Sequence, residues 1–236
     1  MMFKIDNLHV HYGLSHVIQG VSIEAAPGEV VGIFGRNGVG KTTLMKTIAG
    51  WVKPSGGSIS LDDARLDGLE PDQVCHHGVG FVPEDRRIFP GLSVEENLKL
   101  GLMQRPGRTR AEQKAEIDRI YQRMPRLAER RRQIGTTLSG GEQQMLAMAR
   151  VMVGKPKIAL IDEPTEGLAP MIVADIFAII AEMKASGAIV LLVEQNLTGA
   201  LAASDRFYAI ERGTVVLSGD AKNEADKARL VETIAV

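Results

Sequence analysis

The sequence predicts an α/β fold with a mostly parallel sheet, on three observations. Short runs rich in Val and Ile alternate along the chain with segments of helical periodicity. Two of these runs, residues 158–161 and 189–193, lack polar alternation, as expected for strands covered on both faces. A chain of 236 residues with 44% hydrophobic and 24% charged residues can also bury a substantial core.

Six segments are predicted as strands because each is a short apolar run rich in Val and Ile. They are residues 30–34, 80–82, 157–162, 189–193, 207–211 and 214–217. A hairpin turn is predicted at Gly213 and Thr214, between the last two strands.

The middle of the chain, from about residue 95 to residue 153, shows helix signals and no clear strand. One predicted helix carries Ile117, Ile120, Tyr121 and Met124, spaced as one helical face. A second predicted helix begins after Gly141, and its methionines are interpreted as core packing. We therefore expect a single domain over residues 1–236, with a helical subdomain at approximately 90–153 inserted in the α/β core.

Bulk properties exclude several classes of protein. The net charge of −1 gives no electrostatic basis for a nucleic acid partner. The single cysteine, Cys75, excludes an internal disulfide. No apolar run approaches the ~20 residues that a membrane-spanning helix needs, so we expect any role at a membrane to depend on docking onto a membrane-spanning partner.

His9 and His11 are interpreted as surface or strand positions, because no third metal ligand lies near them in sequence.

A phosphate-binding loop is predicted from Gly35 to Thr43, where GRNGVGKTT matches G-x-x-x-x-G-K-[ST] between a predicted strand and a predicted helix over 41–49. Glycines let successive backbone N–H groups face phosphate oxygens, and the helix N-terminus adds its positive dipole end. Lys41 supplies charge for the β- and γ-phosphates, and the Thr42 hydroxyl can ligate Mg²⁺. The candidate ATP-binding residues here are Gly35, Arg36, Asn37, Gly38, Val39, Gly40, Lys41, Thr42 and Thr43.

Two adjacent acids follow the predicted strand over 157–162 and supply the second half of this site. Asp162 ends the strand, where its carboxylate can hold Mg²⁺ directly or through water. Glu163 can take a proton from an attacking water, a role typically worth about 10²–10⁴-fold in rate. The two motifs together predict hydrolysis of a bound nucleoside triphosphate.

The heptapeptide LSGGEQQ, residues 138–144, resembles the signature of ABC ATPases, and the resemblance extends over nearly the whole chain. It implies an ABC-type P-loop fold: a RecA-like mixed sheet core, an N-terminal antiparallel β part and a helical signature subdomain. It also implies a working unit of two ATPase chains with ATP sandwiched between them. The signature residues Ser139, Gly140, Gly141 and Glu142 would then complete the ATP site of the other chain.

The resemblance assigns roles to three further residues. Tyr12 matches the aromatic residue that stacks on adenine. Glu84 stands where the family has the glutamine of its glutamine loop, and is a candidate Mg²⁺ ligand beside Thr42 and Asp162. Gln195 stands in place of the family's switch histidine, so it can donate to the γ-phosphate but cannot titrate near neutral pH. The implied catalytic residues are Glu163, Lys41 and Gln195.

A particular branch is implied by three segments, PEDRRIFP at 83–90, EPTEGLAP at 163–170 and VEQN at 193–196. They resemble the smaller ATPase of branched-chain amino acid importers, and residues 12–16 and 35–39 are also similar to importers of urea and short amides. This branch implies transmembrane permeases, a second ATPase subunit or a second copy of this chain, indirectly a solute-binding protein, and a peripheral place on the cytoplasmic face of the membrane. The alternative is a soluble ABC ATPase of the kind used in iron–sulfur cluster assembly. Ala169, where an Asp is usual, leaves a cross-dimer contact in doubt.

Overall fold

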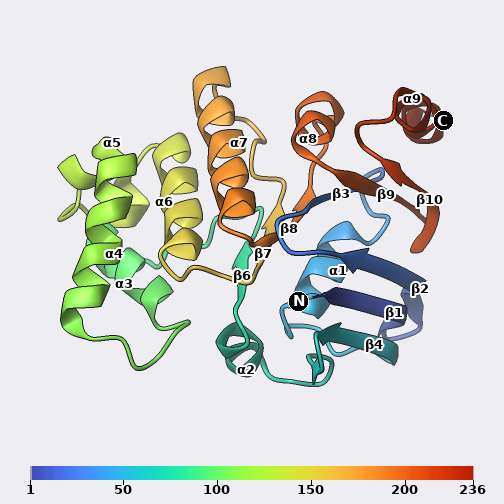
Figure 1. Cartoon of the computed structure of the whole chain (residues 1–236), viewed down its shortest axis with the longest axis horizontal. Helices are drawn as coiled ribbons and strands as arrows, with labels where there is room; N and C mark the ends of the chain where they lie inside the picture. The colour runs from blue at the N-terminus through green and yellow to red at the C-terminus, as the bar shows by residue number, and fades with distance from the viewer. Residues whose placement is uncertain (1, 236) are drawn as a thin grey trace.

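The computed structural model describes residues 2–235 and contains two β-sheets with helices around them (Figure 1). The larger sheet has the order β10-β9-β3-β8-β7-β6, and the smaller has the order β2-β1-β4-β5. In the larger sheet only β10 runs antiparallel to its neighbour. The prediction of a mixed, mostly parallel sheet with an N-terminal antiparallel β part is confirmed.

The elements have the following bounds. The strands are β1 (Phe3–Tyr12), β2 (Ser15–Ala25), β3 (Val30–Phe34), β4 (Gly56–Leu61), β5 (Ala64–Arg65), β6 (Val79–Val82), β7 (Ile158–Asp162), β8 (Ile189–Val193), β9 (Arg206–Glu211) and β10 (Thr214–Asp220). The helices are α1 (Lys41–Ile48), α2 (Pro71–His76), α3 (Val94–Leu102), α4 (Arg110–Arg123), α5 (Pro125–Glu129), the 3₁₀ turn η1 (Gly135–Thr137), α6 (Gly140–Met152), α7 (Pro170–Ala185), α8 (Leu197–Ala203) and α9 (Glu224–Ala235).

All six predicted strands are present, with ends that differ by at most three residues from the prediction. The predicted hairpin turn is wrong by one position. Its two central residues are Arg212 and Gly213, with φ of 48° and 78°, and Thr214 already pairs with Glu211 in the ladder. A tight turn between twisted strands requires positive φ at both central residues, and these two residues provide it.

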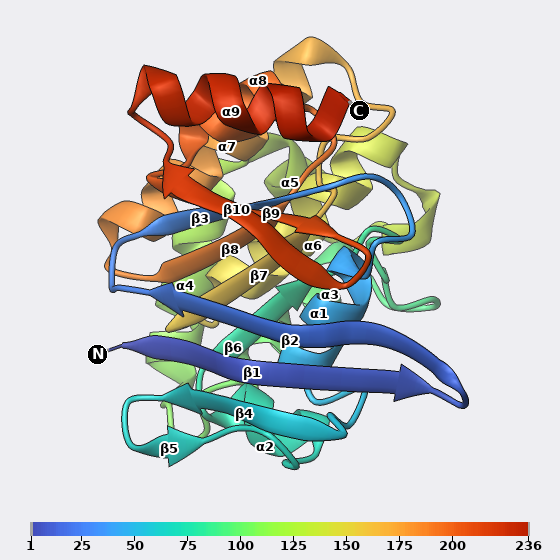
Figure 2. The ribbon, with the colours of Figure 1, turned by 90° about the vertical axis from the view of Figure 1, so that its right-hand side faces the viewer.

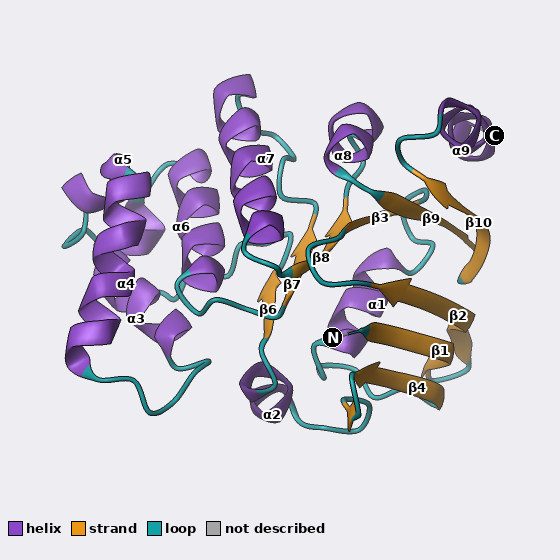
Figure 3. Cartoon of the chain, viewed as in Figure 1, coloured by secondary structure: helices purple, strands orange, loops and turns teal. Residues whose placement is uncertain are grey.

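Helices α3 to α6 gather at one end of the molecule (Figure 3). The signature helix α6 begins at Gly140, earlier than predicted, because the Ser139 side chain caps it by accepting a hydrogen bond from the Glu142 N–H. Met124 lies outside α4, at the junction with α5, yet it is buried. None of the helices in residues 2–235 is long and apolar enough to cross a membrane.

The two faces of the larger sheet build two separate cores. Val31, Ile33 and Leu191 pack with α1 and the smaller sheet in one cluster. Val30 and Leu192 pack with α6 and α7 in the other. Successive side chains of a strand point to opposite faces, so these central strands are apolar on both sides. Figure 2 shows α1 enclosed between the two sheets.

Register places four chain segments at one edge of the larger sheet. Strands β6, β7, β8 and β3 are parallel, and Val82, Asp162 and Val193 end three of them at a similar level. The loops that follow these strands, together with the loop after Phe34, therefore meet at the carboxyl edge of the sheet. In open α/β sheets this edge is where ligands bind.

Candidate nucleotide site

The loop from Gly35 to Gly40 joins β3 to α1 and depends on its glycines. A β-carbon at Gly35 would lie 2.3 Å from the carbonyl oxygen of Ile210, so no larger residue fits there. Gly40 caps α1 with φ of 109°, a conformation that other residues rarely adopt. The first turn of α1 has neither an acidic residue nor a side-chain cap. Its N–H groups and dipole are therefore available to an anion that binds in the loop.

Lys41 is the first residue of α1 and is only 4% exposed. Its ammonium donates to the carbonyl oxygens of Gly35, at 2.8 Å, and of Arg36, at 3.1 Å. It also lies 3.8 Å from a carboxylate oxygen of Glu163. Burial lowers the pKa of Lys41, against the opposing charges of Glu163, Asp162 and Glu84. The geometry brings Lys41 and Glu163 together on either side of the phosphate loop.

Asp162 ends β7 as a fully buried carboxylate, and within residues 2–235 neither of its oxygens has a partner at hydrogen-bond geometry, although the Thr42 hydroxyl lies close enough to lower its pKa. Burial raises its pKa to about 6, the charges of Glu163 and Glu84 act in the same direction, and the nearby Thr42 hydroxyl and Lys41 act in the opposite one. Buried polar atoms nearly always have a partner, so two unpartnered carboxylate oxygens call for one. Carboxylate and hydroxyl oxygens are the ligands that Mg²⁺ takes, so Asp162 and Thr42 fit this ion.

Glu163 follows with a left-handed backbone, at φ of 46°. Its N–H donates to the Val193 carbonyl at 2.9 Å, which holds this strained turn against the end of β8. The side-chain amide of Gln195 donates to Glu163 Oε2 at 2.6 Å. Gln195 therefore fixes the direction of the carboxylate predicted to activate water.

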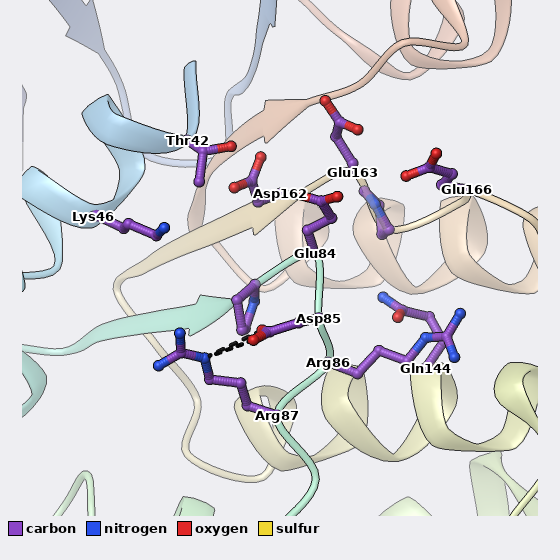
Figure 4. Close-up of a pocket in the computed structure, with 12 residues that line it drawn as sticks. Thr42, Lys46, Glu84, Asp85, Arg86, Arg87, Gln144, Asp162, Glu163 and Glu166 are labelled. Atoms are coloured by element: carbon purple, nitrogen blue, oxygen red, sulfur yellow. Dashed lines mark hydrogen bonds and ion pairs between the residues drawn. The ribbon is translucent and has the colours of Figure 1, made fainter. Parts of the chain in front are cut away.

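Two further acids close the site. Oxygens of Glu84, Glu163 and Glu166 lie within 4.8 Å of one another, and Figure 4 shows these side chains with Asp162 and Thr42 around one space. The space is a cavity of about 390 Å³. A neighbouring cavity of about 320 Å³ runs along the phosphate loop. Residues that line the second cavity are Val17, Asn37, Gly38, Gly40, Lys41, Thr42, Thr43, Glu84, Glu163, Glu166 and Gln195.

Several predicted residues lie away from these two cavities. Gly35, Arg36 and Val39 line another cavity, between the loop and the ends of β9 and α9. Tyr12 ends β1 as a half-exposed ring that lines neither cavity.

The first two signature residues, Ser139 and Gly140, also lie outside the lining of these two cavities. Both are exposed at the start of α6. Ser139 and Glu142 cap each other, with the Ser139 hydroxyl donating to Glu142 at 2.9 Å. One chain alone therefore does not bring Ser139 and Gly140 to its own phosphate loop.

Sequence reasoning missed several residues that line the site, among them Glu166 and Gln144. Glu166 contributes a carboxylate, and its position three residues after Glu163 was the available signal. Gln144 lines the 390 Å³ cavity, and its buried amide nitrogen has no partner. It lies inside the heptapeptide at 138–144, yet no role was assigned to it.

Known proteins with similar sequences agree with this site. A family model described as ABC transporter matches residues 18–166, more than half of the chain. The chain belongs to the ABC transporter family. It is thus an ABC-type ATPase, and its nucleotide-binding character follows from the family.

Relatives of this ABC ATPase cover nearly its full length. It is 40% identical to the high-affinity branched-chain amino acid transport ATP-binding protein BraG of Pseudomonas aeruginosa, over 92% of this chain and 91% of BraG. It is 32% identical to LivG of Escherichia coli, which carries the same description, over 92% and 91% of the two chains. It is 33% identical to the lipopolysaccharide export system ATP-binding protein LptB of E. coli, over 90% and 88%. Among solved structures, the ADP conformation of the cassette MJ1267 superposes with a TM-score of 0.84 at 25% identity, covering 99% and 96%.

Proposed function

We propose that this ABC ATPase is a subunit that powers a membrane importer for branched-chain amino acids or related small polar solutes. The observation that carries the ATPase part is the grouping of Lys41, the unpartnered Asp162 and the Gln195-held Glu163 at one sheet edge. The 40% identity to BraG supports the solute class. A single nucleotide-binding domain over residues 1–236, with the helical subdomain at about 90–153, is part of this proposal.

In the proposed mechanism the chain's own groups bind and orient the nucleotide. The loop N–H groups and Lys41 hold the phosphates, with Lys41 exchanging the Gly35 and Arg36 carbonyls for phosphate oxygens. Thr42 and Asp162, with Glu84 beside them, would hold Mg²⁺. When bound, this ion neutralises charge that develops on the phosphate oxygens. Tyr12 would stack on the adenine.

Proton transfer is assigned to Glu163. Its carboxylate, held by Gln195 at 2.6 Å, can accept a proton from water placed in the adjoining cavity. The Lys41 ammonium lies 3.8 Å from that carboxylate, so the two groups of opposite charge face each other across the site. Residues 139–142 of a second chain would close the site, because those of the same chain are directed elsewhere.

The proposed partners are transmembrane permeases, a second ATPase chain and, indirectly, a solute-binding protein, with this subunit on the cytoplasmic face of the membrane. We propose no nucleic acid partner. The test is affinity purification of the chain from native membranes, followed by mass spectrometry and by uptake of labelled leucine, urea and acetamide into cells with and without the gene. Recovery of two permeases with gene-dependent leucine uptake supports the proposal. Recovery of soluble partners only would contradict it. Gene-dependent uptake of urea or acetamide instead of leucine would change the proposed solute.

A further inference from the structure

Three of the five histidines of the chain gather on one face of the smaller sheet. His9 and His11 come from β1 and His16 from β2, the hairpin at the front of Figure 2. His11 lies directly opposite His16 in the strand register. Sequence alone offered His9 and His11 without a third histidine nearby, and the hairpin brings His16 beside them.

Contacts among the three rings are close. Nδ1 of His9 and Nε2 of His16 lie 3.1 Å apart. The ring of His11 stacks on that of His16, with centroids 4.0 Å apart and planes 9° from parallel. The centroids of His9 and His16 are 5.2 Å apart. The three imidazoles therefore form one cluster outside the nucleotide site.

Ser55 contacts both His9 and His11. Its hydroxyl donates to the His9 carbonyl at 3.1 Å and lies 2.8 Å from His11 Nδ1. In the tautomer with the proton on Nδ1, His11 donates to the Ser55 oxygen and carries its lone pair on Nε2. Metal-bound histidines are usually oriented in this way, by a hydrogen bond from the other ring nitrogen.

We propose that His9, His11 and His16 form a binding site for a divalent transition-metal ion that prefers nitrogen ligands, such as Zn²⁺, Ni²⁺ or Cu²⁺. Two imidazole nitrogens bound to one ion at about 2.0–2.1 Å are about 2.9–3.4 Å apart, and the nitrogens of His9 and His16 already have this separation. The hydrogen between these two rings moves to the outer nitrogen of its own ring, which leaves a lone pair on each inner nitrogen. The His11 ring, now stacked on that of His16, would have to rotate to present its Nε2 as the third ligand, and water would complete the set.

This site is distinct in chemistry and place from the carboxylate-lined cavity. An all-nitrogen set disfavours Mg²⁺, which prefers oxygen. The ion would cross-link β1 and β2 next to Tyr12 and Val17, and Val17 lines the cavity along the phosphate loop.

The test is calorimetric titration of the chain, without a polyhistidine tag and without nucleotide, with ZnCl₂ after removal of metals by chelation. One ion is expected to bind at micromolar concentration. His9→Gln and His16→Gln are each expected to weaken binding at least 10-fold, and Ser55→Ala roughly 10-fold through the loss of His11 orientation. The matched control is His76→Gln with His77→Gln, at the end of α2, which should bind as the wild type does.

An independent readout is the electron paramagnetic resonance spectrum of the wild-type chain with one equivalent of Cu²⁺. Coupling to two or three imidazole nitrogens is expected, and it does not depend on how well any variant folds. Binding only at millimolar metal, binding that the His16→Gln change leaves intact, or a spectrum without nitrogen coupling would each overturn the proposal.

Discussion

Asp162 places a carboxylate in the core with no partner at hydrogen-bond geometry among residues 2–235, and its burial destabilises the free protein. Its pKa is raised from 3.8 to about 6, so the folded state binds more protons than the unfolded state between these values. Stability should therefore fall as the pH rises from about 4 to about 6 and stay level above, at a cost of about 3 kcal/mol near neutral pH.

Replacing Asp162 with Asn should therefore stabilise the free chain at pH 7.5, with a gain that shrinks towards pH 4.5. The same change should abolish the extra stability that Mg·ATP gives the wild type, since a Mg²⁺ ligand is lost. Urea unfolding of both chains at the two pH values, with and without Mg·ATP, measures both effects. An Asn variant less stable than wild type at pH 7.5 would show that the carboxylate has a stabilising partner.

Glu163→Gln tests the assignment of the base. The variant keeps the shape of the side chain and the contact with Gln195, but it cannot accept a proton. We expect ATP binding to persist and hydrolysis to fall by about 10²–10⁴-fold. Fluorescent-nucleotide binding and phosphate release measure the two quantities. Brisk turnover by the variant would assign the proton transfer elsewhere.

Gln195 predicts a particular pH dependence. An amide does not titrate, so the hydrolysis rate should lack a step near pH 6–7 that depends on this residue. Gln195→His should introduce such a step, because an imidazole in this place would titrate near neutral pH. Rate profiles of wild type, Gln195→His and Gln195→Ala from pH 5.5 to 8.5 check this. A step near neutral pH in the wild-type rate that vanishes in Gln195→Ala would contradict this prediction.

At the scale of elements, strands with two buried faces were predictable and contacts between elements were not. The run at 158–162 is apolar throughout, so its strand and the position of Asp162 followed from the sequence. The ladder of β1 with β2 shifts register three times, and only this register brings His16 to His9 and His11. The start of α6 at Gly140 depends on the mutual capping of Ser139 and Glu142. Sequence motifs thus predicted which residues form the nucleotide site. Strand register and packing determine which other residues each of them contacts, and these contacts were not predictable from the sequence.

The loop after β6 is held by a side chain of α6, Arg150, and no sequence motif predicted this contact. Arg86 and Arg87 are both left-handed, at φ of 60° and 44°, a conformation unfavourable for residues with a β-carbon. Arg150 donates to the Arg87 carbonyl at 2.7 Å and to the Arg86 carbonyl at 3.1 Å. Burial lowers the pKa of Arg150 to about 10, so it remains charged at neutral pH. The signature helix thereby holds the loop that carries Glu84.

Arg150→Met should therefore destabilise the chain by roughly 1.5–3 kcal/mol and reduce hydrolysis, because the loop loses its charged donor. Arg150→Lys should recover part of the loss, since one of the two bonds can reform. Arg126→Met is the matched control, because Arg126 pairs only with Glu129 on the surface and should change stability little. Thermal unfolding and turnover of the three variants decide the point; equal stability of Arg150→Met and wild type would contradict it.

At the scale of the whole molecule, Ser139 and Gly140 lie outside the two cavities at the phosphate loop of the same chain, which supports the proposal that a second chain completes the site. In a symmetric dimer each site takes Lys41 from one chain and Ser139 from the other. Lys41→Met and Ser139→Arg should therefore each abolish hydrolysis when assayed alone. A heterodimer of the two variants has one site in which both residues are intact. An equimolar mixture should recover roughly a quarter of wild-type turnover if pairing is random. Phosphate release from the separate and mixed variants measures this, and hydrolysis by Ser139→Arg alone would show that one chain forms a complete site.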